Sequence, residues 1–276
     1  MIKRFVRVAL CQRGATGTKE ENLADTSAMI EEAMHNCPDL DLIIFPEYNY
    51  YESLDPADAK QNAETMSGRY ITEMTRQAKR FGVNLIPGSF AEDVGEKVKN
   101  TCAFIDRTGQ VTARYSKLHL MDAIGVKESA AVEPGTELCV FDTDFGRIGI
   151  MVCFDLRFPE LPRSMVLQGA DIIFCAASFP TGAALPPRTD HWDLMVRSTA
   201  LYNLTWTCAV NQFGTICNGT ENAFGRSMVV DPWGSVVAGA PGRRDIVYAT
   251  LDMQYQQEVR DKVATWGCRR PDIYTL

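Results

Sequence analysis

The most informative stretch of this chain is VCFDLRFPE, residues 152–160. The apolar segment GRIGIM (146–151) precedes it and has the character of a buried strand. The segment LPRSMVLQG (161–169) follows with helical spacing, and Pro159 stands where a first helical turn is expected. The pattern therefore places Cys153 at a junction between a strand and a helix.

A cysteine at such a junction has two interpretations. Backbone N–H groups at the start of a helix carry partial positive charge, which favours the reactive thiolate of Cys153 and indicates a nucleophile. Cysteine is also among the most frequently buried residue types, so a structural role in the core is the alternative. The stretch alone leaves both open.

Composition excludes several classes of partner. The chain has 276 residues, of which 46% are hydrophobic and 23% charged, as in an ordinary globular protein. No linker, short repeat or low-complexity segment divides it, which predicts one domain over residues 1–276. The net charge is −7 without a long basic run, so nucleic acid and anionic membranes are not expected as partners.

The cysteines indicate a reducing compartment. There are nine, an odd number, scattered without a CxxC pair. This usage predicts free thiols in the cytoplasm, with no disulfide framework and no zinc site. The N-terminal residues lack the apolar core of a signal peptide, and no later segment is long enough to span a membrane. With three histidines, no metal or other cofactor is expected.

Periodicity predicts alternating strands and helices, followed by hairpins. This order favours a layered α/β domain with a mixed sheet and helices packed outside. Helices are expected after Thr18, which forms a capping-box signature with Glu21, and over 67–82, 161–169, 189–203 and 254–262. Strands are expected over 6–12, 40–45, 83–90, 101–105, 111–117, 138–146, 146–153, 171–178, 205–212, 225–231, 235–239 and 245–252.

Three of these expected strands end in a reactive side chain. Glu47 follows LIIFP, Lys117 follows RYS, and Cys153 follows GIMV. Catalytic residues of α/β folds tend to lie at strand ends, and charged groups there are costly unless paired or used. Each residue has a structural alternative, as a turn cap, a solvated lysine or a core cysteine. Together they predict one site.

The segments around these residues carry a family resemblance. FPEY (45–48), YSKLHL (115–120) and CFDLRFPE (153–160) resemble the three signature motifs of the nitrilase superfamily of carbon–nitrogen hydrolases. HWDLMVRSTALYN, VNQFG and NAFGRSMVVDPWGSVVA resemble its later blocks, so the likeness covers nearly the whole chain. The resemblance implies a four-layer αββα sandwich with two mixed β-sheets and a catalytic triad of Glu47, Lys117 and Cys153.

The resemblance also implies roles for individual groups. Cys153 attacks the amide carbon, Lys117 and the backbone N–H of Phe154 hold the oxyanion, and Glu47 moves the protons. Lys117 would also help to keep the thiol ionised. Glu128 matches a second glutamate of many members, which orients the lysine or the substrate; a charge on a surface loop is the alternative.

Histidine offers a competing arrangement, because Cys–His is the commoner pairing in cysteine hydrolases. His119 and His191 are the candidates in this chain. The family resemblance makes His119 structural.

The substrate is indicated less directly. Nitrilases proper carry Cys-Trp-Glu, whereas this chain has Cys153-Phe154-Asp155, which favours amides. CFDLRFPE, together with HW at 191–192 and the closing RRPDIY, resembles the ω-amidase branch. The expected function is hydrolysis of a small linear amide, with ammonia released from a thioester intermediate. Hydrolysis of N-carbamoyl amino acids and a non-catalytic nitrilase-like binding protein are the alternatives. The absence of GxGxxG after the early strands argues against a nicotinamide oxidoreductase.

Five residues are candidates for substrate binding. Arg157 is predicted to bind a substrate carboxylate through two parallel hydrogen bonds, or else to anchor the turn through Asp155 or Glu160. The other candidates are Phe154, Ser178, Phe179 and Tyr48. The segments 49–62 and 118–137 are expected to border the site and to hold much of the specificity. The resemblance further implies a homodimer or higher oligomer, with contacts through the helices beside the nucleophile strand.

Overall fold

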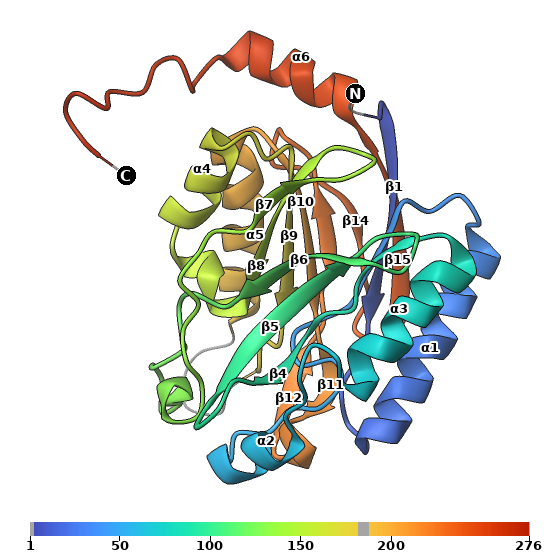
Figure 1. Cartoon of the computed structure of the whole chain (residues 1–276). Coiled ribbons are helices and arrows are strands. Elements are labelled where there is room, and N and C mark those ends of the chain that lie inside the picture. Colours follow the sequence, from blue (N-terminus) through green and yellow to red (C-terminus); the bar gives the residue numbers. More distant parts are fainter. Residues whose placement is uncertain (1–2, 182–187, 276) are drawn as a thin grey trace.

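Two mixed β-sheets lie face to face between outer layers of helices (Figure 1). The structure, a computed structural model, describes residues 3–181 and 188–275. The first sheet consists of β1 (Phe5–Gln12), β2 (Leu42–Ile44), β3 (Asn84–Ile86), β4 (Ser89–Asp93), β5 (Val98–Ile105), β6 (Val111–Ser116) and β15 (Asp245–Asp252). Its strand order is β15-β1-β2-β3-β5-β4, with β6 paired to β5.

The second sheet has the strand order β14-β13-β10-β9-β8-β7. Its strands are β7 (Val140–Asp142), β8 (Arg147–Val152), β9 (Ile172–Ala177), β10 (Trp206–Asn211), β13 (Met228–Val230) and β14 (Val236–Gly239). A separate antiparallel pair consists of β11 (Phe213–Ile216) and β12 (Glu221–Phe224).

The structure describes six α-helices, four of which cover the outer faces of the two sheets. They are α1 (Lys19–Asn36), α2 (Pro56–Asn62), α3 (Arg69–Phe81), α4 (Glu160–Leu167), α5 (Thr189–Asn203) and α6 (Met253–Val263). In Figure 1, α1 and α3 lie outside the first sheet, and α4 and α5 lie outside the second. The predicted αββα sandwich with two mixed sheets is therefore confirmed.

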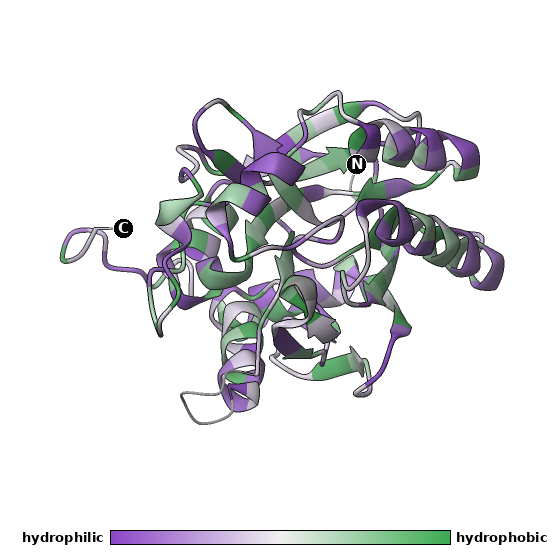
Figure 2. Ribbon diagram, turned by 90° about the horizontal axis from the view of Figure 1, so that it is seen from below, coloured by the Kyte–Doolittle hydropathy of each residue, from purple (hydrophilic) through white to green (hydrophobic). Residues whose placement is uncertain are grey.

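The alternation of side chains along the strands builds this layering. In β1, Val8 and Leu10 belong to the central core between the sheets, whereas Ala9 and Cys11 pack with the helix residue Met29 in the outer core. Both faces of the strand are thus apolar, which explains its nearly unbroken hydrophobic sequence. Figure 2 shows the hydrophobic residues gathered on the strands between the helix layers.

Local sequence signals set the helix ends. The side chain of Thr18 accepts a hydrogen bond from the Glu21 backbone N–H, and the Glu21 carboxylate accepts one from the Thr18 backbone N–H, so the predicted capping box is confirmed. At the end of α3, Gly82 adopts a left-handed conformation (φ 63°), which glycine reaches without strain. Near α5, Arg188 rather than Thr189 precedes the first helical residue.

The local structure differs from the expected elements in several places. Residues 83–90 do not form one strand: Pro87 and Gly88 separate β3 from β4, and Gly88 has φ 80°. Residues 49–62 contain the unpredicted helix α2, with Asp55 as its N-cap. Cys153 is not followed at once by an α-helix, because Cys153–Arg157 form a 3₁₀ helix before α4. The ribbon of β11 and β12 was also not predicted.

Gly88 connects the fold to the loop that carries Glu47. A Cβ atom at this position would lie 1.9 Å from the carbonyl oxygen of Pro46, the residue before Glu47. We therefore expect Gly88→Ala to lower the free energy of unfolding by at least about 3 kcal/mol, because backbone must move as well as adopt a strained φ. Gly82→Ala is the matched control: nothing lies within 4 Å of its Cβ position. It should cost about 1 kcal/mol. Equal urea midpoints for the two variants would contradict this.

Candidate active site

Glu47, Lys117 and Cys153 meet between the two sheets. Glu47 lies on the loop after β2, Lys117 directly follows β6, and Cys153 directly follows β8. Their exposed fractions are only 2%, 2% and 3%. The structure therefore brings together three side chains that the sequence predicts at strand ends, one from the second sheet and two from the first.

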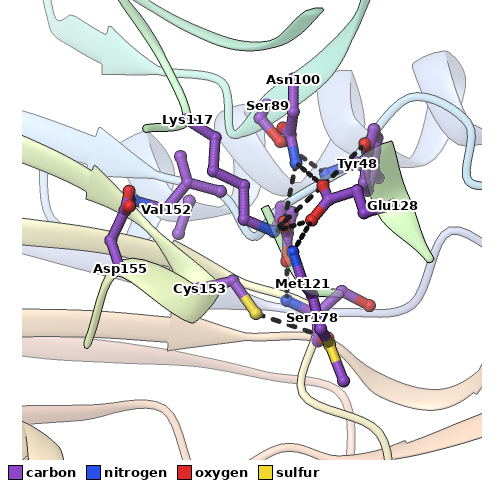
Figure 3. Close-up of polar contacts among 12 residues, drawn as sticks. Tyr48, Ser89, Asn100, Lys117, Met121, Glu128, Val152, Cys153, Asp155 and Ser178 are labelled. Atoms are coloured by element: carbon purple, nitrogen blue, oxygen red, sulfur yellow. Dashed lines mark hydrogen bonds and ion pairs between the residues drawn. The ribbon is translucent and has the colours of Figure 1, made fainter. Parts of the chain in front are cut away.

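The Lys117 ammonium is held between two carboxylates. Its Nζ lies 3.0 Å from Glu47 Oε1 and 2.9 Å from Glu128 Oε2. Figure 3 shows the contact between Lys117 and Glu128. Burial alone would lower the pKa of Lys117, but the charges of Glu47 and Glu128 outweigh it and raise that pKa. Lys117 therefore stays charged. The loop segment 118–137 contributes Glu128, whose Oε2 also accepts a hydrogen bond from the Met121 backbone at 2.7 Å.

The Glu47 carboxylate has a fixed orientation. Oε1 accepts a hydrogen bond from Asn100 Nδ2 at 2.8 Å, and Oε2 accepts one from the Ser178 backbone N–H at 2.7 Å. Burial raises the pKa of Glu47, and Lys117 opposes this shift. Ser178 was predicted to lie at the site. Asn100 was not predicted there, although a buried asparagine within strand β5 is a sequence signal of a site residue.

Cys153 sits in a strained backbone conformation. Its φ is 47°, which is uncommon for a residue with a side chain and is found at functional turns. The sulfur lies 3.8 Å from the Ser178 carbonyl oxygen. Burial raises the pKa of the thiol, and the Glu47 charge adds to this, while Lys117 lowers it by less. Burial and the Glu47 charge thus oppose the ionisation that Lys117 was expected to favour.

Asp155 fastens the turn that carries the thiol. This carboxylate is fully buried and accepts hydrogen bonds from Tyr115 Oη at 2.6 Å and from the Val152 N–H at 2.9 Å. It also lies 2.7 Å from His119 Nδ1. His119 stacks on the Phe158 ring at 3.7 Å. The histidine thus belongs to the support of the turn.

The second histidine, His191, is exposed on α5. His119 is bound to Asp155, and neither histidine hydrogen-bonds the Cys153 sulfur in the described part of the chain. The geometry therefore gives no support to the Cys–His alternative.

A cavity of about 380 Å³ opens onto these groups. Residues of 49–62 and of 118–137 both line it, as expected for segments bordering the site. Its described polar and charged lining includes Glu47, Tyr48, Glu52, Lys117, Glu128, Ser178 and Arg188, and Cys153 also lines it. Tyr48, a predicted binding residue, has its hydroxyl 3.5 Å from Glu128 Oε1.

Three of the predicted binding residues are not part of the described cavity lining, although the contribution predicted for Phe154 is its backbone N–H next to Cys153. Phe154, Arg157 and Phe179 are absent from the described lining of the cavity. Phe179 is 1% exposed and packs against Trp192 and Phe224 in the core. The Arg157 guanidinium lies 5.8 Å from the centre of the Phe154 ring and 5.8 Å from that of the Phe179 ring. It forms no salt bridge with Asp155 or Glu160, because Asp155 is occupied by Tyr115, Val152 and His119.

Two charged residues of the cavity wall were missed from the sequence. Glu52 is 6% exposed, and its Oε2 accepts a hydrogen bond from Gln212 Nε2 at 2.9 Å. Burial raises the pKa of Glu52 to about 8, and the nearby Glu47 charge adds to the shift. Arg188 is 5% exposed. Neither stands in a segment whose periodicity predicts a buried side chain, so no sequence signal marked their burial.

Within residues 3–181 and 188–275, no three His, Cys, Asp or Glu side chains are arranged to hold a metal ion. Each of the nine cysteines is free. None of the described helices has both the length and the apolar character needed to cross a membrane.

A four-layer fold with these groups at its strand ends defines a class of hydrolase. The sequence profile of the carbon-nitrogen hydrolases matches residues 7–261, and the chain belongs to this family. It is 32% identical to the deaminated glutathione amidase of Bos taurus, over 97% of this chain and 83% of that protein. It is 30% identical to the omega-amidase NIT2 of Homo sapiens, over 98% of this chain and 97% of that protein.

A solved structure agrees with this assignment. Nit3 of Saccharomyces cerevisiae, a member of branch 10 of the nitrilase superfamily, superposes with a TM-score of 0.85. The two chains are 27% identical, and the match covers 95% of each.

Glu52 makes the stability of the protein depend on pH. Between its ordinary pKa of 4.5 and about 8, the folded protein keeps a proton that the unfolded chain has released. Glu52 therefore makes stability fall as pH rises through this window. Replacing Glu52 by Gln removes this loss. The free energy of unfolding of the variant, relative to that of the parent, should therefore rise by up to about 1.4 kcal/mol for each pH unit between pH 5 and 7.5. Urea denaturation at both pH values measures this shift.

The matched control is Glu96→Gln, because Glu96 is exposed. Its stability relative to the parent should not change with pH. A Glu52→Gln variant whose pH dependence parallels the parent would show that Glu52 is ionised in the folded protein.

Proposed function

We propose that this protein hydrolyses a small linear amide that bears a carboxylate, releasing ammonia through a thioester on Cys153. The observation that carries the proposal is the buried contact of Glu47, Lys117 and Cys153 at one cavity. The amidase names of two relatives support an amide as the substrate, and ω-amidase activity is favoured.

The first half-reaction forms the thioester. Glu47 takes the proton of the Cys153 thiol as the sulfur attacks the amide carbon. The carbonyl oxygen becomes an oxyanion beside Lys117 Nζ and the N–H of Phe154, which stands at the start of a 3₁₀ helix, where N–H groups lack a partner within the helix. Glu47 then gives the proton to the nitrogen, the C–N bond breaks, and ammonia leaves.

The second half-reaction returns the enzyme to its first state. Water attacks the thioester carbon while Glu47 accepts one of its protons. The C–S bond breaks, the carboxylic acid leaves, and the proton returns to the sulfur. A raised pKa suits Glu47 to this work, because the same group must hold and release a proton near neutral pH. Glu128 orients the Lys117 ammonium throughout.

The setting of the reaction is also proposed. Nine free thiols support a reducing compartment such as the cytoplasm. Exposed apolar side chains on α5, namely Leu194, Leu201 and Tyr202, support a homodimer through this helix. The residues of the site require no cofactor for the proposed steps.

Removing the nucleophile should abolish turnover. We expect Cys153→Ala to release no ammonia in a screen of small amides, nitriles and N-carbamoyl acids in which the parent is active. Cys208→Ala is the matched control, because Cys208 is also fully buried and lies outside the described cavity lining. Ammonia release by purified Cys153→Ala protein would contradict the proposed mechanism. Carbon dioxide released together with ammonia would identify the carbamoyl hydrolase alternative.

Removing the proton carrier should leave little activity. Glu47→Gln keeps the size of the side chain but cannot take the thiol proton, so kcat/KM should fall by about 10²- to 10⁴-fold. The control is Glu92→Gln, since Glu92 is also buried and lies outside the described lining of the cavity. A Glu47→Gln variant within tenfold of the parent would exclude Glu47 as the general base.

A further inference from the structure

Arg188 places a buried positive charge in the wall of the catalytic cavity. It immediately precedes α5, is 5% exposed, and shares the cavity with Cys153 and Ser178. Lys117 is the other buried cation of the described lining, and its charge is already paired with Glu47 and Glu128. Arg188 is therefore the buried cation that remains for a ligand.

The guanidinium is positioned by the chain that follows β9. Nη2 donates a hydrogen bond to the Pro180 carbonyl oxygen at 2.9 Å, and the guanidinium lies 4.9 Å from the centre of the Phe179 ring. Both residues directly follow Ser178, whose backbone N–H holds Glu47. The same strand end thus fixes the arginine and the general base relative to each other.

The remaining donors of Arg188 have no acidic partner within the part of the chain that the structure describes. A guanidinium has five N–H donors, and one is used on Pro180. Among residues 3–181 and 188–275, no carboxylate forms a salt bridge with Arg188. Burial lowers the pKa of Arg188, and the charge of nearby Glu221, which also lines the cavity, opposes this shift. Glu221 forms no salt bridge with the guanidinium. A buried charge without a partner is costly, so an anionic ligand would supply what the chain does not.

We propose that Arg188, rather than Arg157, binds the carboxylate of the substrate and selects short amides that carry one. Arg157 lies outside the described lining and faces the Phe154 and Phe179 rings at 5.8 Å, so it adds positive potential behind Phe179 without reaching the ligand. The predicted effect of Arg188 on turnover rests on the proposed amidase function. The binding of a carboxylate by Arg188 does not depend on it.

The kinetic test compares two amides of equal chain length. Glutaramate carries a carboxylate at the far end, and pentanamide carries a methyl group there. In Arg188→Gln, the ratio of kcat/KM for glutaramate to that for pentanamide should fall by about 10- to 100-fold, mainly through KM. Arg188→Lys should give a smaller fall, because it keeps the charge but loses the fork. Arg157→Gln should change the ratio less than Arg188→Gln does.

Arg76→Gln, on the exposed face of α3 and far from the cavity lining, is the matched control and should leave the ratio unchanged. If Arg157→Gln lowers the ratio and Arg188→Gln does not, the proposal is overturned while the amidase function stands.

Calorimetry separates binding from turnover. Glutarate should bind to Cys153→Ala protein, and the added Arg188→Gln change should weaken that binding by about 10-fold or more. Unchanged affinity, or no binding of glutarate to Cys153→Ala protein, overturns the proposal even if amides are hydrolysed. If the parent hydrolyses no amide but Arg188 still controls glutarate binding, the proposed function fails and the carboxylate site stands. Circular dichroism establishes folding, and Arg188→Lys replaces any Arg188→Gln protein that does not fold.

Discussion

The buried contact of one ammonium with two carboxylates is the constraint on which the site depends. Lys117, Glu47 and Glu128 come from three separate segments, and each carries a charge that water would otherwise solvate. Burying them is tolerable only because the geometry is good and further donors satisfy the oxygens. Asn100, Ser178 and Met121 supply those donors. One ammonium against two carboxylates leaves excess negative charge beside Cys153. Burial raises the pKa of the thiol and the Glu47 charge adds to this shift, so a base must take its proton.

The two sheets are joined at the same place by a second polar contact. Tyr115 and Lys117 stand two residues apart at the end of β6, so their side chains point to the same side, toward the second sheet. Lys117 meets Glu47 and Glu128 there, and Tyr115 donates to Asp155 below the nucleophile turn. Asp155 in turn holds the Val152 N–H beside the strained Cys153. The strain is thus maintained by hydrogen bonds that cross from sheet to sheet.

The sequence predicted the parts of this arrangement that leave a local pattern. Polar residues at the ends of apolar strands identified Glu47, Lys117 and Cys153, and strand alternation with family resemblance predicted the layered fold. The ionisation of Cys153 could not be predicted in this way, because it depends on burial and on a carboxylate more than a hundred residues away. Arg188 and Glu52 were missed for a related reason: no local pattern marks them, and only tertiary packing buries them. The break at Gly88 follows from its close approach to Pro46, another long-range contact.

The same electrostatics bears on how a substrate would be oriented. The end of the cavity near Glu47 and Glu128 carries excess negative charge, which repels a carboxylate and accepts the neutral amide. Arg188, by the assignment proposed above, attracts the carboxylate to the wall beyond Pro180. Glu52 would add a further repulsive charge if it were ionised, but its raised pKa keeps it largely protonated at neutral pH. By that assignment, the uneven charge of the wall would place the amide carbon at Cys153 and the carboxylate away from it. A substrate with these two groups interchanged would bring like charges together in a buried site.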